Sequence, residues 1–145
     1  MEIWKLLLYF EKFPVALLTD TRPEDFIKNA YVQEFGEKLI DSLIREGQRE
    51  PIIINGDEYK RPETQNNTHP LIKTSPGGRR LYAFRELGWT HCKAVLLTYN
   101  FMIPILKKNK LLDAQYESKT KDEAKELFVD HSDHSYVRLE NFMNH

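Results

Sequence analysis

The chain has 145 residues, enough for one domain to bury most of its apolar surface without disulfides or a metal. Its 41% hydrophobic and 12% aromatic residues exclude wholesale disorder, and its net charge of -1 excludes a uniformly basic DNA coat or histone-like protein. The single cysteine, Cys92, allows no internal disulfide, and the N-terminal apolar run 6–9 is too short for a signal sequence or a membrane span. We therefore expect one domain over residues 1–145, cytoplasmic and without membrane contact.

The N-terminal residues predict short elements around a buried strand. Residues 3–10 are almost continuously apolar, and with the run 15–18 they favour a short helix or strand that leads into a buried strand. Residues 19–23 indicate a turn, because Asp and Thr side chains bond nearby backbone and a proline keeps the preceding residue extended. A helical turn is expected to begin at residues 24–26. Trp4 is expected to pack against other residues rather than to stack on a ligand.

The clearest helix is predicted between residues 32 and 47. Its apolar residues recur at spacings of three and four, which forms one face of an amphipathic helix. These residues are Phe35, Leu39, Ile40, Leu43 and Ile44. Gly47 suits the left-handed conformation that ends many helices, and the isoleucine-rich run 51–54 follows it. The pattern therefore predicts a helix that leads into a buried strand.

Residues 57–99 predict a loop followed by a strand, a turn, a helix and a second strand. Residues 57–69 are polar without apolar periodicity, which is typical of an exposed loop, and residues 70–73 favour a brief strand. After a pair of glycines, residues 79–87 predict a short helix and residues 92–99 a strong strand.

The C-terminal part of the chain is less regular, and no internal repeat is visible. Residues 101–112 and 121–129 are expected to form two helices. The tail from Asp130 fits either an edge strand or a packing helix. His131 and His134 have a spacing that suits a metal on one helical turn, but no third ligand of obvious spacing accompanies them, so we expect a solvated tail.

The strongest candidate site is the turn at residues 75–80, which opens the predicted helix 79–87. Consecutive glycines allow positive φ and a close backbone approach, while amides at the start of a helix converge on an anion. Guanidinium groups pair bidentately with phosphate. Adjacent cations at a helix N-terminus are repelled by the positive end of the helix macrodipole, and a bound anion compensates that repulsion. Lys73 and Arg85 keep the surroundings basic. The plain alternative is a tight turn with solvated arginines. The residues assigned to phosphate binding are Ser75, Gly77, Gly78, Arg79 and Arg80.

Taken together, residues 75–89 and 92–96 resemble the glycine–arginine helix and next strand of the ParB/sulfiredoxin superfamily. The earlier helix, which ends at Gly47 before an isoleucine-rich strand, is similar to the same family's step from helix to strand. The resemblance covers residues 15–98, well over half of the chain. It implies an α/β (α+β) fold, a small mixed sheet flanked by helices, with residues 99–145 as a helical C-terminal extension.

In that family the glycine–arginine turn holds nucleotide phosphates, which implies a nucleoside triphosphate, ATP or CTP, with Mg²⁺. Members include CTP-binding partition proteins, ATP-using sulfiredoxins, free-serine kinases and nucleases, so NTP hydrolysis, phosphotransfer and nuclease activity stay open, as does homo-oligomerisation. Sulfiredoxins carry a catalytic cysteine in the turn where this chain has Arg79, and Cys92 is expected in the core. The residues after 98 are too few for both a helix-turn-helix domain and a dimerisation segment. Sulfinic-acid reduction and full partition function are therefore not expected.

Acidic residues in predicted loops flank the expected pocket. A carboxylate there could hold Mg²⁺ or act as the general base on a hydroxyl, as phosphotransfer to serine or metal-dependent nuclease activity requires. The candidate catalytic residues are Asp20, Glu24, Asp57 and Glu58. The sequence does not rank them.

A second function stays open, namely DNA binding or nuclease activity in which the same arginines hold backbone phosphate. Lys107, Lys108 and Lys110, with Tyr99 and Phe101, form another basic and aromatic cluster, which could follow a nucleic-acid backbone. The simpler interpretation of that cluster is a solvated helix face. A third alternative is a catalytically inactive interaction domain that keeps only the fold.

Overall fold

The computed structural model describes residues 2–20, 29–55, 72–74, 78–108, 110, 112–132 and 134–144. In chain order its elements are β1 (Lys5–Pro14), η1 (Val15–Leu17), β2 (Leu18–Asp20), α2 (Ala30–Glu46), β3 (Ile52–Asn55), β4 (Ile72–Thr74), α3 (Gly78–Glu86), β5 (His91–Tyr99), η4 (Asn100–Met102), α4 (Ile103–Lys108), β6 (Glu117–Lys119), α5 (Lys121–Lys125) and α6 (His134–Asn144).

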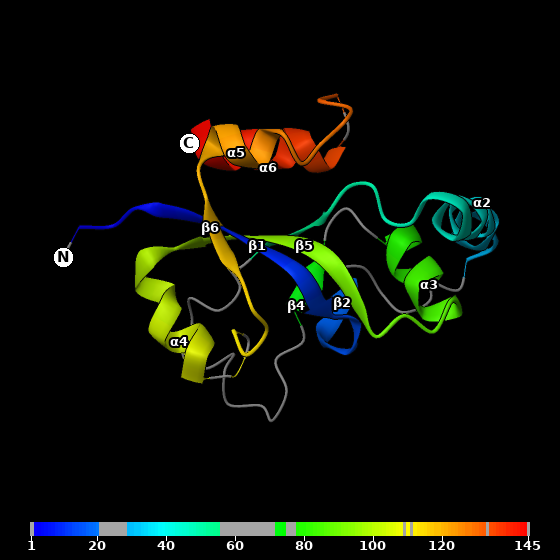
Figure 1. The fold of residues 1–145 in the computed structure, drawn as a ribbon, viewed down its shortest axis with the longest axis horizontal. Helices are drawn as coiled ribbons and strands as arrows, with labels where there is room; N and C mark the ends of the chain where they lie inside the picture. Colours follow the sequence, from blue (N-terminus) through cyan, green and yellow to red (C-terminus); the bar gives the residue numbers. More distant parts are fainter. Residues whose placement is uncertain are drawn as a thin grey trace.

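A six-stranded sheet in the order β2-β4-β3-β5-β1-β6 organises the described residues. β2 and β4 are parallel, as are β3 and β5, whereas the other neighbours are antiparallel. The longest pairing joins β1 to β5, from Lys5 opposite Tyr99 to Pro14 opposite His91. The sheet therefore combines strands from the N-terminal, central and C-terminal parts of the chain (Figure 1).

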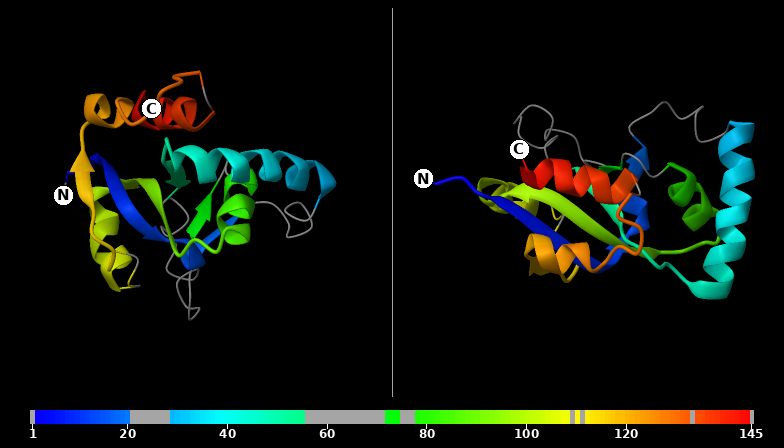
Figure 2. Two further views of the ribbon diagram at one scale, coloured as in Figure 1. Left: turned by 45° about the vertical axis from the view of Figure 1, so that its right-hand side comes forward. Right: turned by 90° about the horizontal axis from the view of Figure 1, so that it is seen from above.

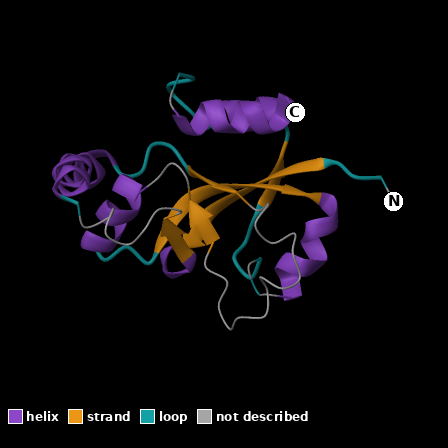
Figure 3. Ribbon diagram, turned by 180° about the vertical axis from the view of Figure 1, so that it is seen from behind, coloured by secondary structure: helices purple, strands orange, loops and turns teal. Residues whose placement is uncertain are grey.

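Helices cover both faces of the sheet, because successive residues of a strand point to opposite sides. In β5, Ala94 and Leu96 join a larger apolar cluster with α2, α3 and α4, while Val95 and Leu97 join a smaller cluster with α5 and α6. α2 and α3 lie at one end of the sheet and α4 at the other (Figures 1 and 2). α5 and α6 form a separate layer on the opposite face (Figure 3).

The central helix and strand predictions are confirmed. α2 occupies the predicted segment, Gly47 follows it with φ +72°, and β3 comes next. α3 and β5 match the segments predicted at 79–87 and 92–99 to within one residue at each end. The strand predicted at 70–73 is observed as β4 (Ile72–Thr74).

The predictions for the edges of the sheet are less complete. Residues 5–14 take the strand alternative, while Thr19 and Asp20, expected in a turn, continue β2 because they pair with β4. β6 was not predicted, since its sequence has no apolar alternation; it forms along the edge that β1 offers. The remaining turn residues 21–23, the helical turn at 24–26 and the loop at 57–69 lie outside the described residues.

The C-terminal predictions hold in outline. The helix expected at 101–112 is observed as η4 and α4, and the one expected at 121–129 ends earlier, at Lys125. The tail takes the helical alternative as α6. The fold class is therefore α+β, a mixed sheet flanked by helices. Within the ranges given above, no helix combines the length and apolarity needed to cross a membrane.

Candidate functional site

The predicted phosphate turn connects β4 to α3. β4 ends at Thr74 and α3 begins at Gly78, so Gly78, Arg79 and Arg80 form the first residues of the helix. Ser75 and Gly77 lie outside the described residues. The helical half of the turn therefore begins four positions after Thr74, the residue at the carboxyl end of β4.

Asp20 is the acidic candidate that the structure brings to this turn. It is the last residue of β2, and it pairs in register with Thr74, the last residue of β4. Because β2 and β4 are parallel, their carboxyl ends lie at the same edge of the sheet, the edge where α/β folds commonly bind ligands. The other acidic candidates, Glu24, Asp57 and Glu58, lie outside the described residues.

Contacts with α2 and with β2 hold α3 in place. Gly36 of α2 lies so close to the ring of Tyr82 that a Cβ atom at Gly36 would overlap it. Arg85, expected to add charge around the turn, donates from Nη2 to the carbonyl oxygen of Leu18 at 2.9 Å. The first turn of α3 contains no acidic residue. The N-terminus of α3 carries the positive end of the helix dipole. It is therefore held at the edge of the sheet with no carboxylate in its own first turn to compensate that partial charge.

The guanidinium of Arg80 binds other parts of the protein. Nη1 donates to the carbonyl oxygens of Glu50 and Pro51, both at 3.2 Å, and Nη2 donates to Ser135 Oγ at 2.7 Å. Ser135 is buried, with 1% of its surface exposed. This side chain therefore joins α3 to the entry of β3 and to the first turn of α6.

The linker between α2 and β3 makes further polar contacts. Gln48 Nε2 donates to the carbonyl oxygens of Glu50 and Lys93 at 3.0 and 2.9 Å, and the backbone N–H of Lys93 donates to Gln48 Oε1 at 2.7 Å. Glu50 Oε1 accepts the backbone N–H groups of Val129 and Asp130 at 3.0 and 3.4 Å. These contacts were not predicted, because their partners lie up to 80 positions apart and no local pattern marks them.

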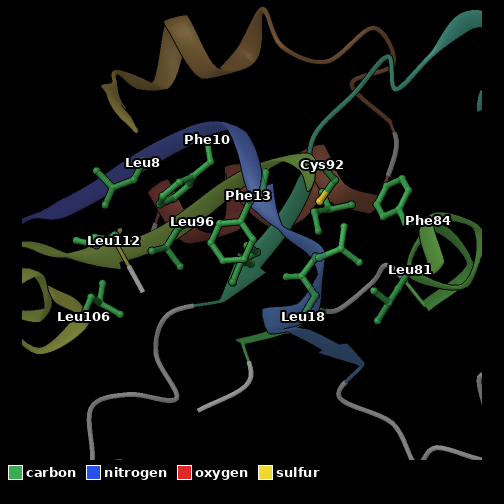
Figure 4. Packing of buried hydrophobic residues seen from close by; sticks show 14 of the residues in the cluster. Leu8, Phe10, Phe13, Leu18, Leu81, Phe84, Cys92, Leu96, Leu106 and Leu112 are labelled. Atoms are coloured by element: carbon green, nitrogen blue, oxygen red, sulfur yellow. The ribbon is translucent and has the colours of Figure 1, made fainter. Parts of the chain in front are cut away.

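Cys92 lies among the side chains of the larger apolar cluster (Figure 4). Burial raises the pKa of its thiol to about 12, although the charge of Arg80 acts in the opposite direction. Because the thiolate is the nucleophilic form, a thiol that keeps its proton at neutral pH is unreactive. The expected core position of Cys92 is confirmed by its 4% exposure.

The buried thiol of Cys92 should make the protein less stable in base. Above its usual pKa near 9 the thiol ionises in the unfolded chain but stays protonated in the folded chain up to about pH 12. The unfolded state then binds fewer protons, so stability falls as the pH rises through this window. Between pH 8 and pH 10, the free energy of unfolding should fall by about 1.5 kcal/mol less in Cys92→Ala than in the wild type. Urea unfolding at both pH values measures this, and an equal fall in the two proteins would contradict it.

The lysines of the second predicted cluster lie at and beyond the end of α4. Lys107, Lys108 and Lys110 are exposed, whereas the rings of Tyr99 and Phe101 stack with centroids 5.5 Å apart and are half-buried. Lysines at the end of a helix also complement its macrodipole. The structure thus separates exposed charges from aromatic rings that are partly used in packing.

Trp4, expected to pack, is instead 54% exposed. It precedes β1, and its backbone is held by Asn100: Trp4 N–H donates to Asn100 Oδ1 at 2.8 Å, and Asn100 N–H donates to the carbonyl oxygen of Trp4 at 3.0 Å. These bonds fix the main chain but leave more than half of the residue's surface in solvent.

The histidine pair of the tail is divided between a loop and a helix. His131 lies in the loop before α6 and its ring contacts that of Tyr136, with centroids 4.5 Å apart; His134 is the first residue of α6. In the part of the chain that the structure describes, no group of three His, Cys, Asp or Glu residues is arranged to hold a metal ion.

In comparisons with known proteins, no family model, curated protein or solved structure matches this chain.

Proposed function

We propose that the chain binds a nucleoside triphosphate, ATP or CTP with Mg²⁺, through its phosphates at the turn of residues 75–80. The observation that carries this proposal is the junction of β4 and α3. An α-helix begins there with Gly78-Arg79-Arg80, four positions after the end of β4 and without an acidic residue in its first turn. The amides and dipole of such a helix end favour an anion, and adjacent arginines there are unfavourable without one. The sequence resemblance to the ParB/sulfiredoxin superfamily supports the same ligand class.

In this proposal the residues of the turn have distinct roles. The amides of Gly77 and Gly78 approach the phosphates, Ser75 adds a hydroxyl, and Arg79 supplies a guanidinium. Asp20, at the carboxyl end of β2, is the first candidate to hold Mg²⁺ or to act as a base if NTP hydrolysis or phosphotransfer follows binding.

Calorimetric titration with ATP, CTP and GTP in the presence of Mg²⁺ tests this function. Arg79→Gln is expected to weaken nucleotide binding at least about tenfold, because a hydrogen bond between charged groups is worth roughly 1.5 kcal/mol or more. Arg49→Gln is the matched control, since Arg49 is an exposed arginine paired with Glu46 at 3.1 Å, outside the turn. An equal loss in both variants, or no binding of any nucleotide to the wild type, would contradict the proposal.

A second candidate function is nucleic-acid binding, with or without nuclease activity, and the exposure of Lys107, Lys108 and Lys110 favours it. Single- and double-stranded DNA in the same titrations separate the two functions. DNA binding should fall steeply with salt and weaken in a Lys107→Gln, Lys108→Gln double variant, whereas nucleotide binding should be unaffected by that variant. If neither ligand binds, the interaction domain is the function that remains.

A further inference from the structure

The C-terminal helices are held on the sheet by apolar and charged contacts. Tyr136 and Leu139 of α6 belong to the smaller apolar cluster, together with Ala124 of α5. Near the end of α6, Lys5 Nζ donates to the carbonyl oxygen of Phe142 at 2.5 Å. Figure 2 shows α5 and α6 lying as one layer beside the sheet, and α6 begins on the side of that layer nearer to α2 and α3. The layer is therefore anchored at both ends of α6.

The anchors at the beginning of α6 involve the candidate site itself. Arg80 donates to Ser135 Oγ at 2.7 Å from the first turn of α3, the helix end to which we assign the phosphates. Glu50, whose carbonyl oxygen also accepts from Arg80, holds the loop before α6 through the N–H groups of Val129 and Asp130. The docking of α6 and the position of the Arg80 guanidinium are therefore linked.

We propose that Ser135 and a bound phosphate compete for Arg80, so that phosphate binding loosens α6 and docked α6 weakens phosphate binding. This inference rests on the proposed function. A phosphate group carries charge and can accept two parallel hydrogen bonds from a guanidinium, whereas the Ser135 hydroxyl that it would displace is neutral and accepts one. Because coupling between two equilibria is reciprocal, the factor by which bound phosphate weakens the docking of α6 equals the factor by which docked α6 weakens phosphate binding.

The test uses inorganic pyrophosphate, the part that all nucleotides share, and two variants of the full chain. Ser135→Ala removes the hydroxyl acceptor, and Glu50→Ala removes the carboxylate that holds the loop at Val129 without removing the backbone carbonyl that Arg80 uses. Both are expected to bind pyrophosphate more tightly than the wild type, Ser135→Ala by about tenfold. In the wild type, pyrophosphate should speed the hydrogen exchange of amides in α6.

Glu46→Ala is the matched control for Glu50→Ala. Like Glu50→Ala, it removes one negative charge, here at the last residue of α2. The Glu46 carboxylate, however, pairs with the exposed Arg49. It should change neither pyrophosphate affinity beyond the small effect of one surface charge nor the exchange of α6. Circular dichroism of each variant checks that the fold is retained. Ser135→Ala and Glu50→Ala remove different contacts, so either one that folds is sufficient for comparing pyrophosphate affinity with the wild type.

The possible results separate this inference from the proposed function. If pyrophosphate binds, α6 exchanges no faster, and Ser135→Ala and Glu50→Ala bind with wild-type affinity, the competition is wrong and the phosphate site stands. If neither the wild type nor either variant binds pyrophosphate, the phosphate site is wrong and the competition fails with it. Binding by Ser135→Ala or Glu50→Ala where the wild type binds weakly or not at all would support both.

Discussion

Arg80→Met is expected to lower the free energy of unfolding by about 3 kcal/mol, because it leaves several buried or half-buried acceptors without their charged donor. Arg80 donates to the carbonyl oxygens of Glu50 and Pro51 and to the hydroxyl of Ser135, and these partners belong to segments that are distant in sequence. Methionine keeps much of the apolar length of the side chain but none of its donors. Urea unfolding followed by circular dichroism measures the loss.

Arg49→Met is the control for the Arg80 substitution. Arg49 donates to the Glu46 carboxylate at 3.1 Å, and both side chains are exposed, so removing this surface pair should cost no more than about 1 kcal/mol. If Arg80→Met unfolds at the same urea concentration as Arg49→Met, the bonds of Arg80 do not hold α3, β3 and α6 together. The expected cost also explains why Arg79, rather than Arg80, is the better position for testing phosphate binding: a loss of binding in Arg80→Met could reflect a loosened fold.

The sequence predicts what is determined locally. α2 follows from the spacing of its apolar residues, and Gly47 ends it because the positive φ of +72° suits glycine. β5 follows from a run of residues that are buried on both faces of the sheet, and α3 from the three-residue spacing of Leu81, Phe84 and Leu87. Each of these signals lies within about a dozen residues, so a single sequence is sufficient to find it.

What the sequence could not predict depends on contacts between distant segments. Asp20 was one of four equivalent acidic candidates, and only the parallel pairing of β2 with β4 brings it opposite Thr74, at the start of the turn. Arg80 was assigned to phosphate from its place beside Arg79, but its bond to Ser135 spans 55 positions. The strand β6 forms on an edge created by β1, more than 100 residues earlier in the chain. Such pairings have no local signature.

Gly36→Ala is expected to destabilise the protein by about 2 kcal/mol, the opposite of what helix propensity alone predicts. In an exposed helix this substitution would stabilise by about 1 kcal/mol. Here a Cβ atom would overlap the ring of Tyr82, so α2 and α3 must separate or the ring must leave its place, and such overpacking typically costs 1–3 kcal/mol, occasionally more. Asp41→Ala, at an exposed position of the same helix, is the propensity control and should be neutral or slightly stabilising.

A double-mutant cycle with Tyr82→Ala identifies the origin of the Gly36 effect. If the cost arises from the ring, Gly36→Ala should become neutral or stabilising once the ring is absent, a coupling of about 2 kcal/mol between the two positions. A cost that persists in the Tyr82→Ala background would contradict this explanation. The close approach at Gly36 also bears on the site, because it helps to hold the first turn of α3 beside the carboxyl ends of β2 and β4. Gly36→Ala should therefore weaken nucleotide binding as well, although Gly36 lies outside the turn.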